Sequence, residues 1–425
     1  MFKVRGGFWI FLVLILLSLG GVIKTEALVY YRILFLGIGV IIISLILAII
    51  SLNGITVQRT ARITRHLVGQ VFEERFLIYN NSLFPKIWLE IRDYSNLVGE
   101  TGSKVLSNVK QKDHRSYISY SLLNRRGLIP LGPTKISSGD PLGLFQKTKI
   151  FPSTDSLLVF PYFGPLNKFP LRPGLLPGGN AMRKKTFEVT PYAAGIRDYV
   201  PSDSLNRIHW PSTAKRNRLM VKEFDQDPQS DVWIFLDSQK SVHMKVDENI
   251  VTDKLDRFWI WEEQKIRKIP PETYEYGISI AASIANFALD NSHAVGMATA
   301  GQISTILPAE RGSRQFIKIL ELLAYIQCEG DQPLSALVET QTPYFQKGSA
   351  VVMITVSDDK KVIHSCIEEI TRRRMNPIVI FIDANSFGGH NNYEQIGNDL
   401  KIRNVPVKVI SRGDDISSVL NSFSA

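Results

Sequence analysis

Two long stretches without any charged side chain lie close to the start of this 425-residue chain. Residues 6–23 and 33–52 consist mostly of leucine, isoleucine, valine and aromatic side chains. Each is close to the roughly 20 residues that a helix needs to cross about 30 Å of hydrocarbon. The short connection between them carries Lys24 and Glu26. We therefore predict that residues 1–55 form a two-helix transmembrane hairpin.

The first stretch could also be a signal peptide, because Lys3 and Arg5 precede it. No small-residue cleavage site follows, however, and the second stretch comes almost at once, so a hairpin fits better. Two cations, Lys24 and Arg32, lie on the turn side of the pair. Five cations flank the outer ends of the two stretches: Lys3, Arg5, Arg59, Arg62 and Arg65. This bias predicts that both termini and the soluble domains face the cytoplasm.

The net charge of +10 indicates an anionic partner, such as a membrane surface or an acidic protein. We expect no nucleic acid, because the cations are spread along the chain and no RNP, zinc-finger or helix-turn-helix pattern occurs. Arg59, Arg62 and Arg65 could contact lipid headgroups, but ordinary charges that stop membrane transfer are the simpler interpretation. The two cysteines, Cys328 and Cys366, have no metal-site neighbours, so we expect reduced thiols.

From residue 56 the composition changes to short β-prone runs separated by glycine, proline and asparagine. Residues 72–79, 86–92 and 117–123 are such runs. Strand-length runs at short intervals predict an antiparallel β-sandwich over residues 56–165. Gly139-Asp140-Pro141 has the composition of a tight turn, in which Gly permits unusual φ, Asp caps and Pro restricts the next φ. We assign this turn a structural role.

Residues 166–230 begin with a linker rich in proline and glycine and continue into a segment dense in charge. From residue 231 apolar runs and amphipathic helical patterns alternate. The runs at 232–236, 350–356 and 378–382 are continuous, as in buried parallel strands. This alternation predicts a doubly wound, mostly parallel α/β sheet over residues 231–425.

The charged segment, residues 195–225, combines turn signals with opposite charges. Asp203 and Arg207 lie four residues apart and would share a helix face. Residues 219–224 alternate apolar and charged side chains, which indicates a strand. The cations of the segment include Arg207, Lys215, Arg216, Arg218 and Lys222, opposed by Asp198, Asp203, Glu223 and Asp225. A structural network of ion pairs is favoured over a site for an anion or an acidic partner.

The order and spacing of residues in this segment resemble the signature of the DUF58 family. The matching positions are Tyr199-Val200-Pro201-x-Asp203, Arg207-Ile208-x-Trp210, Ala214-Lys215 and Leu219-Met220-Val221-Lys222-Glu223, with His209 and Arg218 inside the same signature. Members of that family look like bacterial membrane-anchored proteins whose C-terminal part is similar to a von Willebrand factor A domain. Their biochemical role is undefined. The resemblance implies such a domain here, anchored in a bacterial inner or plasma membrane.

The von Willebrand A resemblance also implies a metal site at the carboxyl edge of the sheet. That site resembles Asp-x-Ser-x-Ser, with a Thr from a second loop and an Asp from a third. Asp237 and Ser241 match the first and last positions, whereas Gln239 replaces the middle Ser. Ser313 would take the place of the Thr, and Asp358 that of the final Asp. Such hard oxygen ligands suit Mg²⁺; the alternative is that Asp237 only caps the next turn.

Three functions are consistent with these features. The favoured one is a non-enzymatic, membrane-tethered interaction module, whose partner by family resemblance would be a MoxR-type AAA+ ATPase, with this protein as adaptor or assembly factor. The alternative is a divalent-metal-dependent ligand-binding domain that uses Asp237, Ser241, Ser313 and Asp358. The least favoured is a hydrolase using Asp203 and His209, because adjacent positions on a short helix do not align a nucleophile, a base and an orienting group.

An insertion over residues 239–271 contains two tryptophans, within residues 258–261. These aromatic side chains could form a partner surface, or they could pack against the β-sandwich or the bilayer interface. We expect packing within their own domain rather than binding of a partner.

Overall fold

In a computed structural model, the described residues are 2–25, 27–61, 65–99, 102–152, 155–171, 193–201, 203, 205–224, 231–246 and 269–423. The chain divides into two compact units. One consists of Met1–Tyr162 and Asn249–Pro270, the other of Phe163–Glu248 and Pro271–Ala425. The predicted division at residues 55, 165 and 230 stays a prediction.

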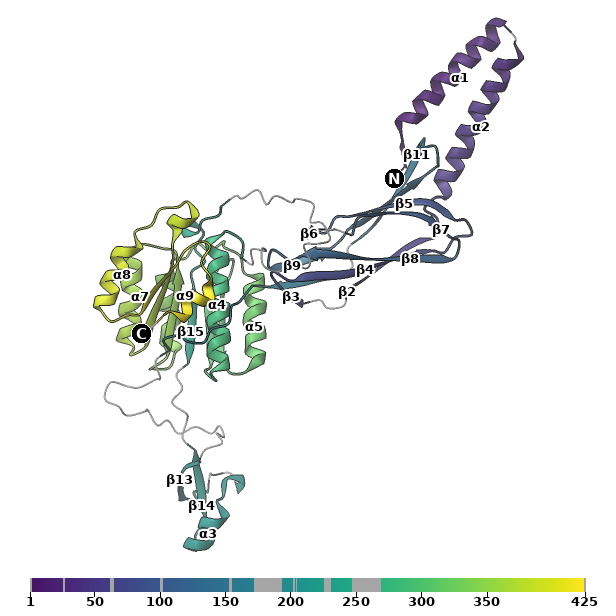
Figure 1. Cartoon of the computed structure of the whole chain (residues 1–425). Coiled ribbons are helices and arrows are strands. Elements are labelled where there is room, and N and C mark those ends of the chain that lie inside the picture. Colours follow the sequence, from purple (N-terminus) through teal and green to yellow (C-terminus); the bar gives the residue numbers. More distant parts are fainter. Residues whose placement is uncertain are drawn as a thin grey trace. The chain divides into compact units, whose positions relative to one another are not determined.

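Two apolar helices open the first unit, α1 (Gly6–Thr25) and α2 (Leu28–Ile50) (Figure 1). Both are long and apolar enough to cross a bilayer, which confirms the two predicted helices. A Cβ on Gly37 would lie 2.9 Å from the Ile15 side chain, and one on Gly21 would lie 2.4 Å from the ring of Tyr30. Glycine at these two positions therefore lets the helices approach closely, as in many helix pairs within membranes.

Two sheets of antiparallel strands pack face to face beyond the helices. Their strand orders are β2-β4-β8-β6 and β1-β11-β10-β5-β7. The strands are β1 (Phe2–Val4), β2 (Ile55–Ala61), β4 (Val71–Asn80), β5 (Lys86–Asp93), β6 (Val98–Gly99), β7 (Lys104–Val109), β8 (Asp113–Leu122), β10 (Thr134–Gly139) and β11 (Phe145–Phe151). Phe76 and Ile78 from one sheet meet Leu89, Ile91 and Ile136 from the other in a fully buried core. The predicted antiparallel β region is thus confirmed.

A third, smaller sheet has the order β3-β12-β9. It consists of β3 (Arg65–Leu67), β12 (Asp155–Phe160) and β9 (Gly127–Leu131). β12 pairs with β9 in antiparallel fashion but with β3 in parallel. Leu157 and Val159 of β12 pack with Val68 and Phe72 in a second buried cluster, so this sheet extends the core of the same unit.

The turn between β10 and β11 is held by Asp140, which is almost fully buried. Its Oδ1 accepts a hydrogen bond from the backbone N–H of Phe145 at 2.7 Å, and its Oδ2 accepts one from that of Leu144 at 3.1 Å. Leu144 and Phe145 then pack against Phe8 and Ala48 of the two helices. The expected structural role of this turn is confirmed, and the turn also supports the base of the hairpin.

Two lysines join the end of α2 to the sheets. The Lys86 ammonium donates to the carbonyl of Ile50 at 2.9 Å, and the Lys147 ammonium donates to that of Ile49 at 2.7 Å. Carbonyls in the last turn of a helix lack intrahelical partners, and cations are favourable there. Burial, and secondly the charge of Lys147, lower the pKa of Lys86. The chain therefore leaves the hairpin along a defined path.

A buried ion cluster lies in the first unit, centred on Arg59 of β2. Its guanidinium donates to Glu74 and to Asp93, each at 2.7 Å, and lies 4.7 Å from the centre of the Phe76 ring. The three charged side chains are at most 9% exposed. Arg59 is therefore a core residue rather than a contact for lipid headgroups, while Arg62 lies outside the described residues.

The second unit contains a six-stranded sheet with the order β17-β16-β15-β18-β19-β20. Its strands are β15 (Val232–Leu236), β16 (Val295–Ala300), β17 (Ser304–Glu310), β18 (Ala350–Thr355), β19 (Asn376–Ile382) and β20 (Val407–Ile410). All neighbouring pairs are parallel except β16 and β17. The predicted, mostly parallel sheet is therefore a mixed sheet with one antiparallel edge strand.

Helices lie on both faces of this sheet. They are α4 (Thr273–Asp290), α5 (Ser313–Tyr325), α6 (Leu334–Gln341), α7 (Lys360–Arg372), α8 (Tyr393–Ile402) and α9 (Ile416–Asn421). Side chains of α6, α7 and α8 share one core with Phe235 and Val351. On the other face a Cβ on Gly277 of α4 would lie 3.1 Å from Leu236 and 3.3 Å from Ile382. Helices on two faces explain why the central strands are apolar throughout.

Candidate functional site

The carboxyl edge of the six-stranded sheet is the first candidate site. The strand order reverses between β15 and β18, because β16 and β17 lie on one side of that pair and β19 and β20 on the other. Open α/β sheets bind ligands beyond the carboxyl ends of the strands at such a reversal. Asp237 directly follows β15 and Thr355 ends β18, so both residues lie at this position.

Asp237 is only 2% exposed, and both of its carboxylate oxygens accept hydrogen bonds. Oδ2 accepts from the Thr355 hydroxyl at 2.6 Å, and Oδ1 accepts from the backbone N–H of Gln239 at 3.1 Å. The Gln239 amide then donates to the Ser241 hydroxyl at 2.9 Å. A buried carboxylate requires such donors, and the Asp237 side chain therefore organises the loop that follows β15.

His243 also stabilises the loop that follows β15. Its Nε2 donates to the carbonyl oxygen of Asp237 at 3.0 Å, and its Nδ1 lies 3.0 Å from the Thr273 hydroxyl. Burial is the main cause that lowers the pKa of His243, and nearby Asp237 opposes this to a smaller extent. The neutral imidazole is therefore favoured in the folded protein.

A line of buried hydroxyls continues this polar layer. The Ser238 hydroxyl lies 2.7 Å from that of Thr299 and 2.9 Å from that of Tyr274. Sequence reasoning missed these residues together with Thr355 and His243. One usable signal was that Thr355 lies near the end of the predicted strand at residues 350–356, in the same sheet as the run that precedes Asp237.

The structure brings together only part of the predicted metal-ligand set. Ser241 and Asp358 follow β15 and β18 at the carboxyl edge, and the Asp358 carboxylate accepts from the backbone N–H of Asn392 at 2.9 Å. Ser313 does not join them. It begins α5 after the antiparallel strand β17, in which Glu310 pairs with Val295, the first residue of β16. Ser313 therefore lies at the amino edge of the sheet, a strand length away.

The residues at the carboxyl edge fit a metal ion only in part. Among the side chains that the structure describes, no three His, Cys, Asp or Glu groups are placed to hold a metal ion. Asp237 supplies one buried carboxylate, with hydroxyl oxygens beside it. Each of its oxygens accepts one hydrogen bond, from Thr355 or from Gln239, and keeps a second lone pair that could face a cation.

The charged signature segment forms a small β-hairpin with a helix in its connection, the second candidate site. β13 (Ala193–Asp198) pairs in antiparallel register with β14 (Met220–Phe224), which confirms the strand predicted there. Between them lie a 3₁₀ turn, Leu205–Arg207, and α3 (Trp210–Arg216). Pro211 lies in the first turn of α3, where proline is tolerated. The backbone N–H of Tyr199 donates to the carbonyl of Leu219 at 2.9 Å.

The signature contains one ion pair between predicted members of the network and one to an arginine outside the predicted set. Asp203 receives two hydrogen bonds from the Arg197 guanidinium, at 2.5 and 2.6 Å, and one from the backbone N–H of Val200. Arg218 pairs with Asp198 at 3.1 Å. The predicted partner of Asp203, Arg207, has a side chain outside the described part of the chain. A structural network therefore exists, but Arg197 is its main cation.

Two other cations of the signature are Lys215 and Lys222. Neither forms an ion pair with a side chain that the structure describes. They lie on α3 and β14. Asn217, in the left-handed conformation at φ 51°, ends α3 and directs the chain into β14. These lysines are thus presented on a defined scaffold.

His209 contacts Ser212 rather than Asp203. Its Nδ1 lies 2.7 Å from the Ser212 hydroxyl, one turn along the start of α3. Asp203 is already engaged by Arg197, so the pair named in the hydrolase hypothesis has two different sets of partners.

Apolar side chains on the signature face outward. Trp210 is 65% exposed and Leu205 is 66% exposed, and both lie in the connection between the two strands. Lys215 and Arg216 lie in the last turn of the helix that Trp210 begins. Exposed aromatic side chains on a segment that also carries arginine are typical of protein-binding surfaces. The tryptophans at 259 and 261 of the predicted insertion lie outside the described residues.

A family model described as "Protein of unknown function DUF58" matches residues 195–254, which include this signature and Asp237. The chain is also similar to the uncharacterized protein YeaD of Bacillus subtilis (strain 168). The two are 26% identical over 243 residues, which cover 56% of this chain and 52% of YeaD. The chain thus spans about half the length of this curated relative.

Two solved structures show a weak likeness. One is the CARDB domain of a Pyrococcus furiosus protein in complex with di-metal ions, which is 10% identical, with a TM-score of 0.17, covering 25% of this chain and 91% of that one. The other is the alkylpurine DNA glycosylase AlkC of Pseudomonas fluorescens, also 10% identical with a TM-score of 0.17. This match covers 34% of this chain and 42% of AlkC. A likeness of this size carries no information on the fold of this chain.

Proposed function

We propose that this protein is a non-enzymatic, membrane-tethered interaction module that acts as adaptor or assembly factor for a MoxR-type AAA+ ATPase. The observation that carries the proposal is the outward-facing Trp210 and Leu205, on the segment that matches the family model and also carries Lys215 and Arg216. Tryptophan and arginine are the residue types that most often dominate binding energy in protein interfaces.

The C-terminal unit is proposed to be similar to a von Willebrand factor A domain. Support comes from a mostly parallel sheet with helices on both faces, and from Asp237 at the carboxyl end of β15. The buried bonds of Asp237 and His243 rigidify the loop after β15, which would give a partner a preformed surface. Such a platform serves docking better than bond breaking.

The tether in this proposal is the pair α1 and α2, embedded in a bacterial inner or plasma membrane with the soluble units in the cytoplasm. Their length and apolar composition support it. So does the flanking charge, five cations on the outer side against two on the turn side. A tether of this kind confines the docking surface to the neighbourhood of the bilayer and raises its local concentration for a membrane-associated partner.

The proposal is tested by affinity purification of the full chain from solubilised membranes. We expect a MoxR-type ATPase to copurify with the wild type and with Tyr344→Ala, and to be lost with Trp210→Ala. Tyr344 is the matched control, because it is an aromatic residue that is 83% exposed in the same unit but outside the signature. Recovery of no ATPase with the wild type, or equal recovery with both variants, contradicts the proposal.

A second candidate function is the binding of a divalent cation, with Mg²⁺ as the expected ion, at the carboxyl edge. The buried Asp237 carboxylate beside the Thr355 hydroxyl favours it, with Ser241 and Asp358 as further oxygen ligands. Calorimetric titration of the detergent-solubilised full chain with Mg²⁺, Mn²⁺ and Ca²⁺ checks it. Heat of binding that is seen with the wild type and is lost in Asp237→Asn supports the site. The absence of any heat of binding with the wild type excludes it.

A further inference from the structure

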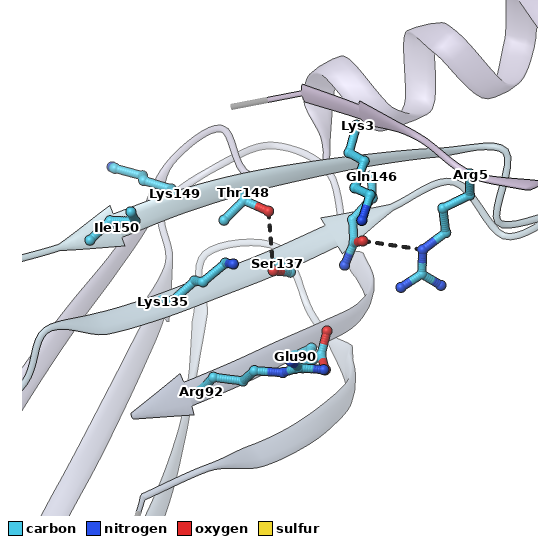
Figure 2. A pocket seen from close by; sticks show the side chains of 10 residues that line it. All are labelled: Lys3, Arg5, Glu90, Arg92, Lys135, Ser137, Gln146, Thr148, Lys149 and Ile150. Atoms are coloured by element: carbon cyan, nitrogen blue, oxygen red, sulfur yellow. Dashed lines mark hydrogen bonds and ion pairs between the residues drawn. The ribbon is translucent and has the colours of Figure 1, made fainter. Parts of the chain in front are cut away.

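A basic pocket lies on the outer face of the five-stranded sheet in the unit that carries the helical hairpin. Its volume is about 630 Å³, which lies within the range of small-molecule sites. β1, β5, β10 and β11 line it, as Figure 2 shows. The charged side chains of its lining are one carboxylate, Glu90, and five cations: Lys3, Arg5, Arg92, Lys135 and Lys149.

Strand register explains how cations from distant parts of the chain meet on this face. Lys135 of β10 lies between Arg92 of β5 and Ile150 of β11, and Lys3 of β1 lies opposite Gln146 of β11. The alternate residue Ile136 points into the sandwich core. The pocket is therefore built by the pairing of four strands and not by a local run of basic residues.

Neutral hydrogen-bonding groups line the pocket between the cations. The Ser137 and Thr148 hydroxyls lie 3.2 Å apart on neighbouring strands, as the dashed line in Figure 2 marks. The Gln146 amide oxygen accepts from Arg5 Nε at 3.1 Å, which holds that guanidinium at the pocket. Hydroxyls and a fixed guanidinium are suitable donors for the oxygens of a phosphate group.

The positive charge of the pocket is not balanced within the described part of the chain. Glu90 is already bonded to Arg92, with Oε1 2.8 Å from Nε. Lys3 and Lys135 form no ion pair among the described side chains, and Lys135 lies directly opposite Arg92. Like charges opposite each other on neighbouring strands are unfavourable. Lys149 is directed elsewhere, since its ammonium lies over the Phe151 ring.

The location of the pocket indicates the source of its anion. Arg5 immediately precedes Gly6, the first residue of α1. If α1 crosses the bilayer, as the proposed function on which this inference rests states, residues that border it lie in the headgroup layer. Basic pockets beside transmembrane helices bind anionic headgroups. We propose that this pocket binds the phosphodiester headgroup of an anionic phospholipid, with Lys3, Arg5 and Lys135 pairing its charge.

The test uses the full chain in phosphatidylcholine nanodiscs that contain a small fraction of phosphatidylglycerol. Native mass spectrometry measures how strongly phosphatidylglycerol is retained over phosphatidylcholine. Lys3→Gln/Lys135→Gln removes two pocket cations without breaking an ion pair of the described structure. At roughly five-fold per cation near the surface, we expect retention to fall about 25-fold.

The matched control is Lys110→Gln/Lys112→Gln, which removes the same charge from the turn after β7. This turn lies at the end of the unit where α2 leaves, because Asn80 bonds to the Lys110 carbonyl at 2.9 Å and Asn81 to that of Gly54 at 2.8 Å. We expect the control to retain phosphatidylglycerol like the wild type. Equal retention by the wild type and the pocket variant, or an equal loss in the control, overturns the inference.

A second arm separates lipid from soluble anions. Inorganic phosphate and glycerol 1-phosphate are added at millimolar concentration to the detergent-solubilised chain before lipid is offered. If either prevents retention of phosphatidylglycerol in the pocket, the ligand is a soluble phosphate and the lipid assignment is overturned. A chain that stays in solution without detergent contradicts the membrane tether itself, which distinguishes failure of the proposed function from failure of this inference.

Discussion

Single side chains of this protein owe their roles to what surrounds them rather than to their type. Arg59 and Arg92 both pair with carboxylates in the same unit, yet Arg59 is 9% exposed and Arg92 is 59% exposed. Around Arg59, burial is the main cause that raises the pKa of Glu74, and Arg59 opposes it. The buried guanidinium therefore bonds to two carboxylates inside a core, whereas the Arg92 side chain is exposed to solvent.

Replacing Arg59 with Leu should destabilise the first unit strongly. The change leaves Glu74 and Asp93 without their shared cation in a buried place, which typically costs about 3–5 kcal/mol. Thermal unfolding of the full chain in nanodiscs, followed by circular dichroism, measures the effect. Arg92→Leu is the control and should leave the transition almost unchanged, because its partner is accessible to water. Similar losses in the two variants would show that the Arg59 cluster is not the buried network described above.

Acidification should weaken the second unit through His243. Because burial lowers the folded-state pKa of His243 below its ordinary value near 6.5, the unfolded chain binds the proton more readily. The stability that the neutral imidazole contributes is complete above that value and is lost as the pH falls toward the folded-state pKa. One such group changes stability by at most about 1.4 kcal/mol per pH unit.

Urea unfolding at pH 5, 6 and 7, followed by tryptophan fluorescence, measures this dependence. His243→Gln should show a smaller loss of stability than the wild type between pH 7 and pH 5. Identical pH profiles would contradict the assignment of this loss to His243.

At the scale of elements, the carboxyl edge is held together by a close approach of backbones. The segment around Gly330 pairs with the loop after β15, where the N–H of Lys240 donates to the Gly330 carbonyl at 2.8 Å and the Gly330 N–H donates to that of Ser238 at 3.0 Å. A Cβ on Gly330 would lie 2.0 Å from the carbonyl oxygen of Ala300. No flexible side chain can move aside there, so two loops depend on this glycine.

Gly330→Ala should therefore lower the free energy of unfolding by about 1–3 kcal/mol, because backbone atoms must shift. Gly397→Ala is the matched control. It lies within α8, where a Cβ would meet only Val407 at 3.9 Å, so the same substitution should gain up to about 1 kcal/mol from helix propensity. Urea midpoints of the full-length variants compare the two. Equal midpoints would mean that the two backbones are farther apart than described.

At the scale of the whole molecule, the proposed orientation in the membrane can be measured directly. Single cysteines are placed at Lys24 or at Tyr344 in a chain that carries Cys328→Ser and Cys366→Ala. A membrane-impermeant maleimide added to spheroplasts should label Lys24→Cys at once and Tyr344→Cys only after permeabilisation. This result follows from cytoplasmic soluble units with the helical turn outside. Labelling of Tyr344→Cys in intact spheroplasts would reverse the orientation.

The sequence by itself determined the local features of this protein. Uncharged length specified α1 and α2, short β-prone runs between turn residues specified the β-rich region, and continuous apolar runs located β15 and β18 and hence Asp237. Each of these features depends on a residue and its near neighbours in the chain. Such patterns can be recognised without knowing which distant residues the segment contacts.

Only the tertiary structure decided which distant residues meet. Thr355 bonds to Asp237 from 118 positions away, and the basic pocket joins β1 to β5, β10 and β11. The antiparallel direction of β17 moves Ser313 to the other edge of the sheet, away from the predicted site. Strand pairing, direction and burial are set by packing across the whole unit, and a linear pattern of residue types does not contain them.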